Sequence, residues 1–428
     1  MNHPTIDEVD PAWRVFVGIA QLLTMDGPGP TADDTLGLIS DAAIVTDGAG
    51  TIRWLGPRTA MADIQGLDAA PVIDLGGVIA LPALVDPHTH LVFAGDRAAD
   101  FAARCAGATY AEIAAAGGGL VTTVTATRAA SAETLVGLAK ARLDALAREG
   151  VLTVEIKSGY GLTISDELKQ LAVIQLLREL VPQRLVATLL LHKVPPELAD
   201  TPETWFEAVC DELLPRARPL AEFVDIFVDV GAYTPEAAAP LMARASALGF
   251  KLKAHTEQLT ASGFGAAMAE LGATSLEHLE HASEAVLDAM AAHGTVAVLL
   301  PGASVFLGDD ARPPVRAMRA RGIPMALGTD LNPGSSATSN PWLIATLACT
   351  QYGLSPAEAL IGLTRNAASA IGQGDRAGRL AVGRRADFVT SRVPTWLHLT
   401  YGLGHHPVYE VYLAGQPLPQ LGLDLAFS

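Results

Sequence analysis

Cysteine is scarce in this sequence, with only three residues, Cys105, Cys210 and Cys349, among 428. They form neither a CxxC motif nor the regular spacing of a disulfide framework, which is typical of a protein from a reducing compartment. A phosphate-binding loop is also missing, because the glycines at 117–119 are not followed by GxxxxGK and a Ser or Thr. These absences exclude a disulfide-stapled domain and disfavour a nucleotide-binding function.

Basic residues are in deficit as well. The sequence has 29 Lys and Arg residues against 46 Asp and Glu residues, which gives a formal net charge of -17. Such acidity argues against nucleic-acid or membrane partners, although a single arginine in a pocket can still bind a small anionic substrate. No apolar run reaches the roughly 20 residues that span a bilayer. Residues 1–13 contain several acids and no apolar segment of a secretory signal, so we expect a cytoplasmic protein.

The patterns that are present divide the chain into three parts. Residues 12–77 contain short strands and turns, typical of a small β unit. From about residue 79, apolar strands alternate with Ala- and Leu-rich helical stretches, which is the pattern of a parallel (β/α)8 barrel. Strand patterns return after residue 371. We therefore predict an α/β fold in which a barrel (79–375) carries a small β-sandwich built from both chain ends (1–78 and 376–428). The candidate barrel strands are 77–86, 152–159, 185–192, 223–229, 250–256, 273–279, 296–302 and 323–330.

Histidines and acids collect where such a barrel places its chemistry, at the carboxyl ends of strands. The first candidate strand ends in Asp86-Pro87-His88-Thr89-His90, and residues two apart on a strand point to the same face. His192, His255, His278 and Asp330 end later strands. A set of imidazoles and one carboxylate suits Zn²⁺ or Fe²⁺ better than Ca²⁺ or Mg²⁺. Any single histidine is more often an ordinary core residue, but that explanation must account for five strand ends at once.

The order of these residues resembles the amidohydrolase superfamily, and within it the imidazolonepropionase family. The similar segments run from about residue 82 to 372 and include DPHTHLVFAGDR, GATYAEIAAAGGGLVTTVTATR, EIKSGYGL, HKVPPE, KAHTEQL, VAVLLPG and GTDLNPGSS. The resemblance implies a metal-dependent hydrolase that opens the ring amide of 4-imidazolone-5-propanoate to N-formimino-L-glutamate, with one Zn²⁺ or Fe²⁺/Fe³⁺ ion. It also implies a homodimer.

Carried over position by position, the resemblance assigns a role to each candidate residue. The metal ligands would be His88, His90, His255 and Asp330, and His278 would stand beside the metal as a polarising or proton-transferring group. The substrate would be surrounded by Arg97, Tyr110, Tyr160, His192, Gln258, Asn332, Gly334 and Ser335. A divalent ion lowers the pKa of a bound water, and Asp330 could take its proton and pass it to the leaving nitrogen. The fork of Arg97 matches a carboxylate.

Several alternatives stay open at this stage. Arg97 could be a surface residue paired with Asp96 or Asp100, Tyr160 could be a packing residue, and Asn332-Pro333-Gly334 is also an ordinary turn. Four positions, Leu190, Leu191, Lys193 and Glu277, differ from the family pattern, and the resemblance implies that they lie in the wall of the pocket. Because of these differences, a related cyclic amide or ureide with an acidic arm remains the alternative substrate class. A non-catalytic binding barrel is the other hypothesis.

Overall fold

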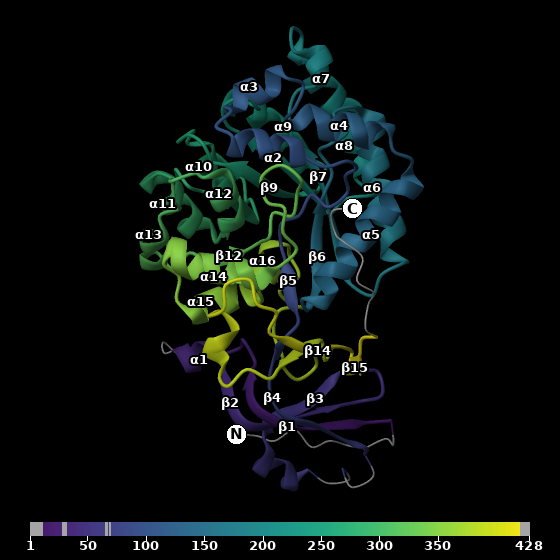
Figure 1. Ribbon diagram of the computed structural model, residues 1–428, viewed down its shortest axis with the longest axis vertical. Coiled ribbons are helices and arrows are strands. Elements are labelled where there is room, and N and C mark those ends of the chain that lie inside the picture. Colours follow the sequence, from purple (N-terminus) through teal and green to yellow (C-terminus); the bar gives the residue numbers. More distant parts are fainter. Residues whose placement is uncertain (1–11, 28–31, 65–66, 68–69, 420–428) are drawn as a thin grey trace.

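The computed structural model describes residues 12–27, 32–64, 67 and 70–419. Most of the acidic N-terminal segment considered for a secretory signal therefore lies outside the described residues. A helix-surrounded barrel forms one end of the molecule and a smaller sheet forms the other (Figure 1). Within the described ranges, no helix is both long enough and apolar enough to cross a membrane.

Eight parallel strands form the barrel, in the same order in space as along the chain. They form where the sequence has short apolar runs, and every residue of β6 is buried, as expected when helices cover one face and the barrel interior the other. The predicted barrel is confirmed. Its strands are β5 (Leu84–Asp86), β6 (Val151–Lys157), β7 (Arg184–Leu191), β8 (Phe223–Val228), β9 (Lys251–Thr256), β10 (Ser275–His278), β11 (Val296–Leu299) and β12 (Met325–Leu327).

The helices begin where the sequence supplies caps. The side chain of Ser131 accepts a hydrogen bond from the Thr134 amide at the start of α5, and Thr163 does the same for Asp166 at the start of α6. The helices of the barrel part are α2 (Ala98–Cys105), α3 (Tyr110–Ala115), α4 (Leu120–Ala129), α5 (Ala132–Arg148), α6 (Ile164–Arg178), α7 (Pro202–Ala208), α8 (Leu214–Ala217), α9 (Pro235–Ala247), α10 (Phe264–Glu270), α11 (Glu284–His293), α12 (Pro301–Leu307), α13 (Val315–Ala320), α14 (Pro341–Tyr352), α15 (Pro356–Gly362) and α16 (Arg365–Ala370).

Strands from both ends of the chain share the second sheet, which confirms the predicted β unit. Its seven strands lie in the order β15-β14-β13-β4-β1-β2-β3. Alternate residues of β2 enter two hydrophobic clusters, Ala42 and Ile44 in one and Ala43 and Val45 in the other, so both faces of the sheet are covered. The bounds are β1 (Arg14–Leu23), α1 (Ala32–Leu36), β2 (Leu38–Thr46), β3 (Ile52–Pro57), β4 (Val72–Pro82), β13 (Phe388–Ser391), β14 (Val408–Leu413) and β15 (Gln416–Pro417).

The first candidate strand, 77–86, is divided between the two sheets. Residues up to Pro82 belong to β4, which pairs with β1 and β13, whereas β5 begins at Leu84 and pairs with β6. The apolar run is continuous across this point, so hydrophobicity alone gave no sign of the change of sheet. The short β5 brings the HxH segment directly to the mouth of the barrel.

Candidate active site

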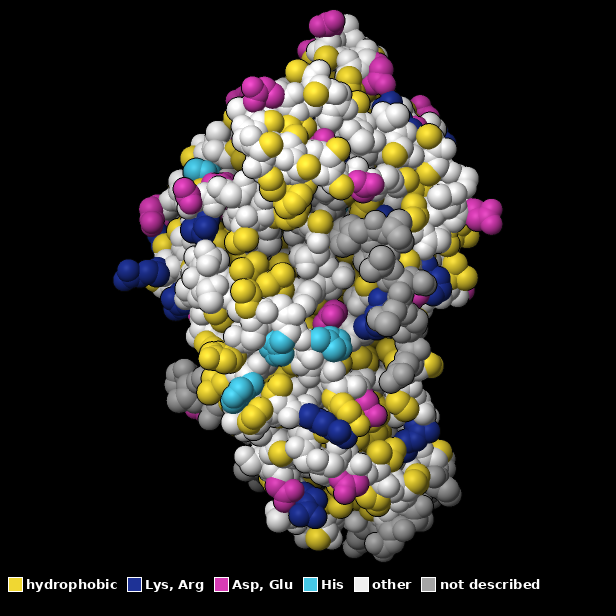
Figure 2. Space-filling view, viewed as in Figure 1, with side chains coloured by type: hydrophobic (Ala, Val, Ile, Leu, Met, Phe, Trp, Pro, Cys, Tyr) yellow, Lys and Arg dark blue, Asp and Glu magenta, His cyan; other side chains and the backbone are white. Residues whose placement is uncertain are grey.

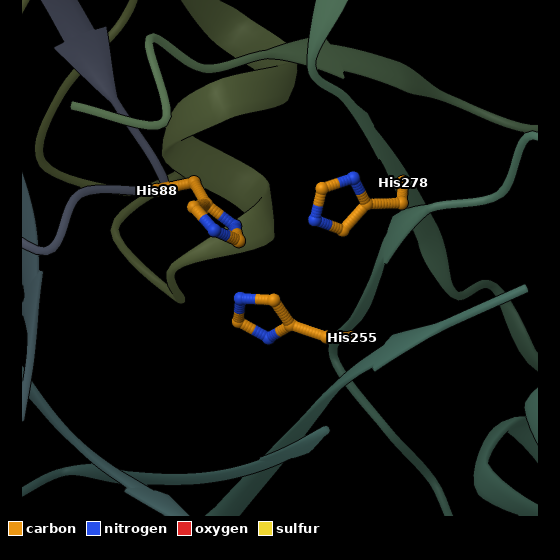
Figure 3. Close-up of side chains that lie close together, drawn as sticks. All are labelled: His88, His255 and His278. Atoms are coloured by element: carbon orange, nitrogen blue, oxygen red, sulfur yellow. The ribbon is translucent and has the colours of Figure 1, made fainter. Parts of the chain in front are cut away.

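Four histidines and one aspartate converge at the carboxyl ends of the barrel strands. His88 and His90 follow β5, His255 lies in β9, His278 ends β10, and Asp330 follows β12. All five are buried. The ring centroid of His88 lies 4.5 Å from that of His255, 5.2 Å from that of His90 and 6.0 Å from that of His278. The imidazoles of His88, His255 and His278 face a common space (Figure 3). The structure therefore brings together the residues expected from distant strand ends.

The donor atoms fit a divalent metal ion. Nε2 of His88 lies 3.2 Å from Nε2 of His90, and each is 3.4 Å from Oδ1 of Asp330. His88, His90 and Asp330 form one group with donor atoms within 4.8 Å of one another, and His88, His255 and His278 form another. Nε2 of His255 is buried without a hydrogen-bond partner. A buried ring nitrogen without a partner is costly, and a cation in this space would satisfy it.

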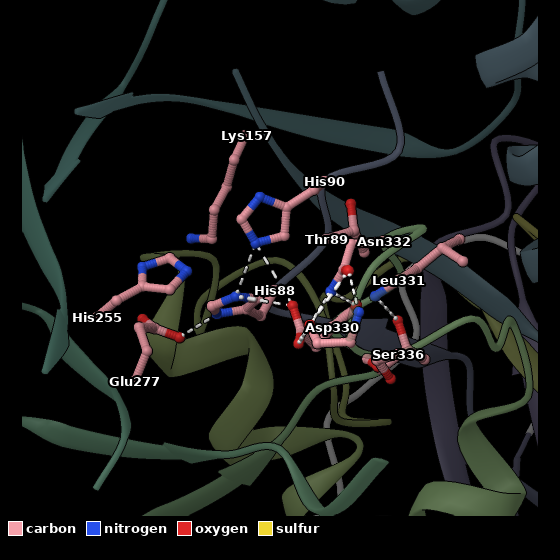
Figure 4. A network of polar contacts seen from close by, with 12 residues as sticks. His88, Thr89, His90, Lys157, His255, Glu277, Asp330, Leu331, Asn332 and Ser336 are labelled. Carbon is pink, nitrogen blue, oxygen red and sulfur yellow. Dashed lines mark hydrogen bonds and ion pairs between the residues drawn. The ribbon is translucent and has the colours of Figure 1, made fainter. Parts of the chain in front are cut away.

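Two buried carboxylates orient two of these rings, and Figure 4 shows the first of them, Glu277, beside His88. Nδ1 of His88 lies 2.6 Å from Oε2 of Glu277, and Nδ1 of His255 lies 3.0 Å from Oδ1 of Asp225. An ionised carboxylate accepts a hydrogen bond from the protonated Nδ1, so Nε2 of each ring keeps its lone pair to bind a metal ion. Each of these carboxylate–imidazole pairs fixes both the tautomer and the direction of its ring.

The backbone at the site is held in an unfavourable conformation. His278 has a φ of 72° and Asp330 a φ of 52°. Residues other than glycine rarely adopt positive φ, and such strain collects where a side chain must be aimed at a functional point. A hydrogen bond of 3.0 Å from the Asp330 amide to the His88 carbonyl holds Asp330 in this conformation.

The protonation states favour cation binding. Burial lowers the pKa of His90 to about 4 and that of His278 to about 3, and it also lowers the pKa of His255. Burial acts to raise the pKa of Asp330, but its hydrogen bonds to His88 and His90 outweigh burial and hold that pKa well below its usual range. Near neutral pH, three rings therefore keep free lone pairs beside an ionised carboxylate.

Tyr160 and His192 line the site next to His90. Their ring centroids lie 6.0 and 6.2 Å from that of His90, and Nδ1 of His192 contacts the Gly159 carbonyl at 3.1 Å. Tyr160 is buried and also contacts Phe93, so it packs in the wall and faces the site at once.

Arg97 is not a surface residue, since only 14% of its side chain is exposed. Its Nε does donate to Asp100, as the alternative interpretation expected, while Nη1 points to Gly334. A Cβ at Gly334 would lie 3.1 Å from that Nη1, so glycine leaves room for the guanidinium. Asp100 also accepts a hydrogen bond of 2.9 Å from the Gly119 amide, which ties Arg97 to the GGG segment.

The segment after Asp330 is a turn held by its own side chains. Oδ1 of Asn332 accepts from the amides of Gly334 and Ser335, at 2.8 Å each, and its Nδ2 donates to the Asp330 carbonyl at 2.7 Å. Oγ of Ser335 lies 3.3 Å from Oδ2 of Asp330. The side chain of Asn332 thus shapes the turn, and Ser335 is the residue of this segment that reaches the site carboxylate.

Gln258 and Tyr110 are the remaining two candidates. Gln258 follows β9, where its amide donates to Asp229 at 3.0 Å. Tyr110 begins α3, and its side chain lies outside the described part of the structure. Phe101 of α2 and Phe306 of α12 stack with ring centroids 5.3 Å apart. Hydrophobic side chains gather on this part of the surface in Figure 2. These two helices follow β5 and β11, so they border the mouth.

The positions that differ from the family pattern have varied environments. Leu190 lies against Gly159, which has a φ of 109°, and Leu191 is buried in the main core. Lys193 is exposed. Glu277 is not part of the pocket wall, because it is fully buried beneath His88.

Sequence reasoning did not predict two buried polar arrangements, although it singled out Glu277, a member of the first, as a difference from the family pattern. The first is a layer of charges below the site: Glu155, Lys157, Asp225, Lys253 and Glu277. The second is Glu280, whose Oε1 accepts from Ser304 and Tyr352 and whose Oε2 lies 3.8 Å from Nδ1 of His278. Charged residues at alternate positions inside apolar strands were the available signal for the first group.

Comparisons with known proteins agree with this geometry. A family model described as the amidohydrolase family matches residues 94–393. The chain is 46% identical over 383 residues to the imidazolonepropionase of Erwinia tasmaniensis, covering 89% of this chain and 94% of that protein. It is 44% identical over 418 residues to that of Symbiobacterium thermophilum, covering 95% and 97%.

Solved structures share the fold at low identity. An adenosine deaminase from Xanthomonas campestris with bound zinc superposes with a TM-score of 0.69 at 18% identity, covering 94% of this chain and 92% of that one. The guanine deaminase of E. coli gives 0.66 at 15% identity, covering 96% and 99%. The family model and the close relatives together decide the assignment: this chain belongs to the imidazolonepropionase family of amidohydrolases.

Proposed function

We propose that this protein hydrolyses the ring amide of 4-imidazolone-5-propanoate and releases N-formimino-L-glutamate. The observation that carries the proposal is the buried group of His88, His90, His255 and Asp330 with the guanidinium of Arg97 at the same barrel mouth. The close relatives named imidazolonepropionase support the same substrate.

The metal site is proposed to hold one Zn²⁺ or Fe²⁺/Fe³⁺ ion through these three histidines and Asp330. A set of three nitrogens and one oxygen supports a borderline ion over Ca²⁺ or Mg²⁺. When bound, the ion lowers the pKa of a water and polarises a carbonyl. Nε2 of His88 and His255 would point to it, because Glu277 and Asp225 occupy their Nδ1 atoms.

Proton transfer falls to Asp330 and His278. Asp330 is ionised, so a carboxylate oxygen can accept the proton of the attacking water and deliver it to the leaving ring nitrogen. Ser335 contacts Oδ2 of this carboxylate and can hold it in place. His278 is neutral and stands across the site, where it can donate a hydrogen bond to the oxygen that gains charge.

Recognition of the acidic arm falls to Arg97. Its Nε is engaged by Asp100, so the Nη groups are left for the propionate carboxylate. Tyr160, His192 and Gln258 would contact the ring, and Gly334 and Asn332 would keep the space beside Arg97 open. Tyr110 is proposed as a further substrate-binding residue on the family resemblance alone. We further propose a cytoplasmic homodimer, which the scarcity of cysteine and the family resemblance support.

The test is an ultraviolet assay of freshly generated imidazolone propionate with purified protein. We expect loss of its absorption with the protein, no loss after treatment with a chelator, and recovery on adding Zn²⁺ or Fe²⁺. Turnover of another cyclic amide or ureide with an acidic arm, without turnover of imidazolone propionate, would establish the second substrate class. Metal binding without any turnover would support the non-catalytic barrel.

A further inference from the structure

A continuous chain of buried ion pairs runs below the proposed metal site, from one ligand histidine to another. It begins at Glu277, which contacts His88. Oε1 of Glu277 lies 3.2 Å from Nζ of Lys253, and this Nζ lies 3.7 Å from Oε1 of Glu155. Glu155 Oε1 contacts Lys157 Nζ at 2.8 Å, Lys157 contacts Asp225 Oδ2 at 2.7 Å, and Asp225 Oδ1 reaches His255. We call Glu155, Lys157, Asp225, Lys253 and Glu277 the ion ladder.

None of the five ladder side chains is exposed to solvent. They come from β6, β8, β9 and β10, and their polar atoms are held by further contacts inside the barrel. Ser275 donates to Glu277 at 2.6 Å, and Thr188 donates to Glu155. Buried ions are stable only when each has its partners, so removal of one member leaves an uncompensated charge.

The two lysines also hold the segment that carries the HxH histidines. Nζ of Lys253 donates to the carbonyl of Pro87 at 2.9 Å, immediately before His88. The amide of Lys157 donates to the carbonyl of Thr89 at 2.9 Å, between His88 and His90. Neither ammonium has a direct hydrogen bond to a ligand histidine in the described structure, yet both act on groups that set the direction of those rings.

The charge of the ladder complements a divalent ion. Three carboxylates and two ammonium groups leave one net negative charge, and Asp330 adds a second. A divalent cation at the histidines would neutralise both. Loss of an ammonium would leave a bare carboxylate, which would take up a proton or distort the contact that orients its histidine.

We propose that the ion ladder acts as one unit that sets metal affinity, with Lys253 and Lys157 as positioning residues that touch no ligand histidine. The proposal rests on the metal site proposed above and is independent of the substrate. Its failure can therefore be separated from failure of the proposed reaction.

The test measures Zn²⁺ affinity of the metal-free protein by competition with a chromogenic chelator. Lys253→Met should raise the dissociation constant by about 10-fold to 100-fold, the usual cost of losing an outer contact to a metal site. The matched control is Lys251→Met, which makes the same change two residues away on β9, at an exposed lysine outside the ladder. The Zn²⁺ dissociation constant of the control should stay within about twofold of the wild-type value, because all five ladder charges remain in place.

A charge-compensated variant distinguishes this role from a general loss of structure. Lys253→Met with Glu277→Gln removes the ammonium and the carboxylate that it neutralises. We expect this double variant to bind Zn²⁺ more tightly than Lys253→Met alone, whereas a purely structural defect would become worse. The visible spectrum of the Co²⁺ form should follow the same order, since it reports ligand geometry.

Two results would overturn the proposal. One is a folded Lys253→Met protein with wild-type Zn²⁺ affinity, and the other is a double variant that binds more weakly than the single variant. If Lys253→Met does not fold, the nearly isosteric Glu277→Gln takes its place, and wild-type affinity in that variant would also overturn the proposal.

Discussion

Thr89 and Leu331 form a parallel bridge between the segments that follow the first and last barrel strands. The amide of His90 donates to the Leu331 carbonyl at 3.0 Å, and the amide of Asp330 donates to the His88 carbonyl at the same distance. Three of the four proposed metal ligands therefore flank this bridge. The contacts that join the first and last strands of the barrel thus also hold three of the four proposed metal ligands together.

We expect about one divalent ion per chain, because one His/His/His/Asp set closes one mononuclear site. The ammonium of Lys157 is held by Glu155 at 2.8 Å and by Asp225 at 2.7 Å, so this lysine does not bridge a second ion. Elemental analysis of protein purified without chelator and dialysed against metal-free buffer measures this ratio. A reproducible value near two would contradict a single site.

Replacing Asp330 with Asn should lower turnover by at least about 10³-fold, since general acid–base catalysis commonly contributes 10²–10⁴. The change nearly preserves shape but removes both a charged ligand and the proposed proton carrier. Steady-state assays on the metal-loaded variant measure the loss. Retention of more than about a tenth of the activity would assign the proton transfer to another residue, with His278 the first candidate.

Arg97→Met separates recognition of the acidic arm from chemistry. We expect kcat/KM to fall by about 30-fold to 1,000-fold, which corresponds to about 2–4 kcal/mol of lost transition-state stabilisation, as when one partner of a buried charged pair is removed. Metal content should stay unchanged, because Arg97 lies beside Gly334 and not among the ligands. The loss should shrink for an analogue without the carboxylate. Equal losses on both substrates would show that Arg97 only supports the loop through Asp100.

Glu280 should make stability depend on pH. Burial raises its pKa to about 8 in the folded protein, from 4.5 for the ordinary group. Because the folded pKa is the higher one, the stabilising contribution is complete only below about pH 4.5 and is lost as pH rises through about 8. Glu280→Gln cannot ionise, so its free energy of unfolding should rise relative to wild type over that window, by on the order of a few kcal/mol.

Urea unfolding of the metal-free proteins at about pH 5 and about pH 8.5 measures this difference. Glu270→Gln is the control, because Glu270 is exposed at the end of α10. Parallel pH profiles for wild type and Glu280→Gln would show that the carboxyl group of Glu280 titrates in the same range whether folded or unfolded.

The sequence predicted the barrel and the convergence of His88, His255 and Asp330 because strand ends in a parallel barrel must meet at one face. It did not locate the change of sheet at Ala83, since the surrounding residues are apolar on both sides. Where a strand is fully buried, periodicity carries no information about which sheet it joins.

The partners of the site residues were harder to predict. Glu277 was expected at the pocket wall. Its contact with His88 depends on the register of β10 beside β9, and this register cannot be read from a single sequence. The contact of Glu280 with Ser304 and Tyr352 joins a strand end to two helices far along the chain. Strand patterns predict positions along a barrel, whereas these contacts depend on how neighbouring elements face one another.

The shared terminal sheet has a consequence for the order of synthesis. Strands β1 to β4 are made first and can pair among themselves, but Ile79–Pro82 of β4 pairs with Phe388–Ser391 of β13. An emerging chain must therefore carry an open strand edge, which is a site for unwanted association, while the whole barrel is translated. Only when the last strands leave the ribosome can the edge be covered, so premature termination after the barrel would leave it permanently exposed.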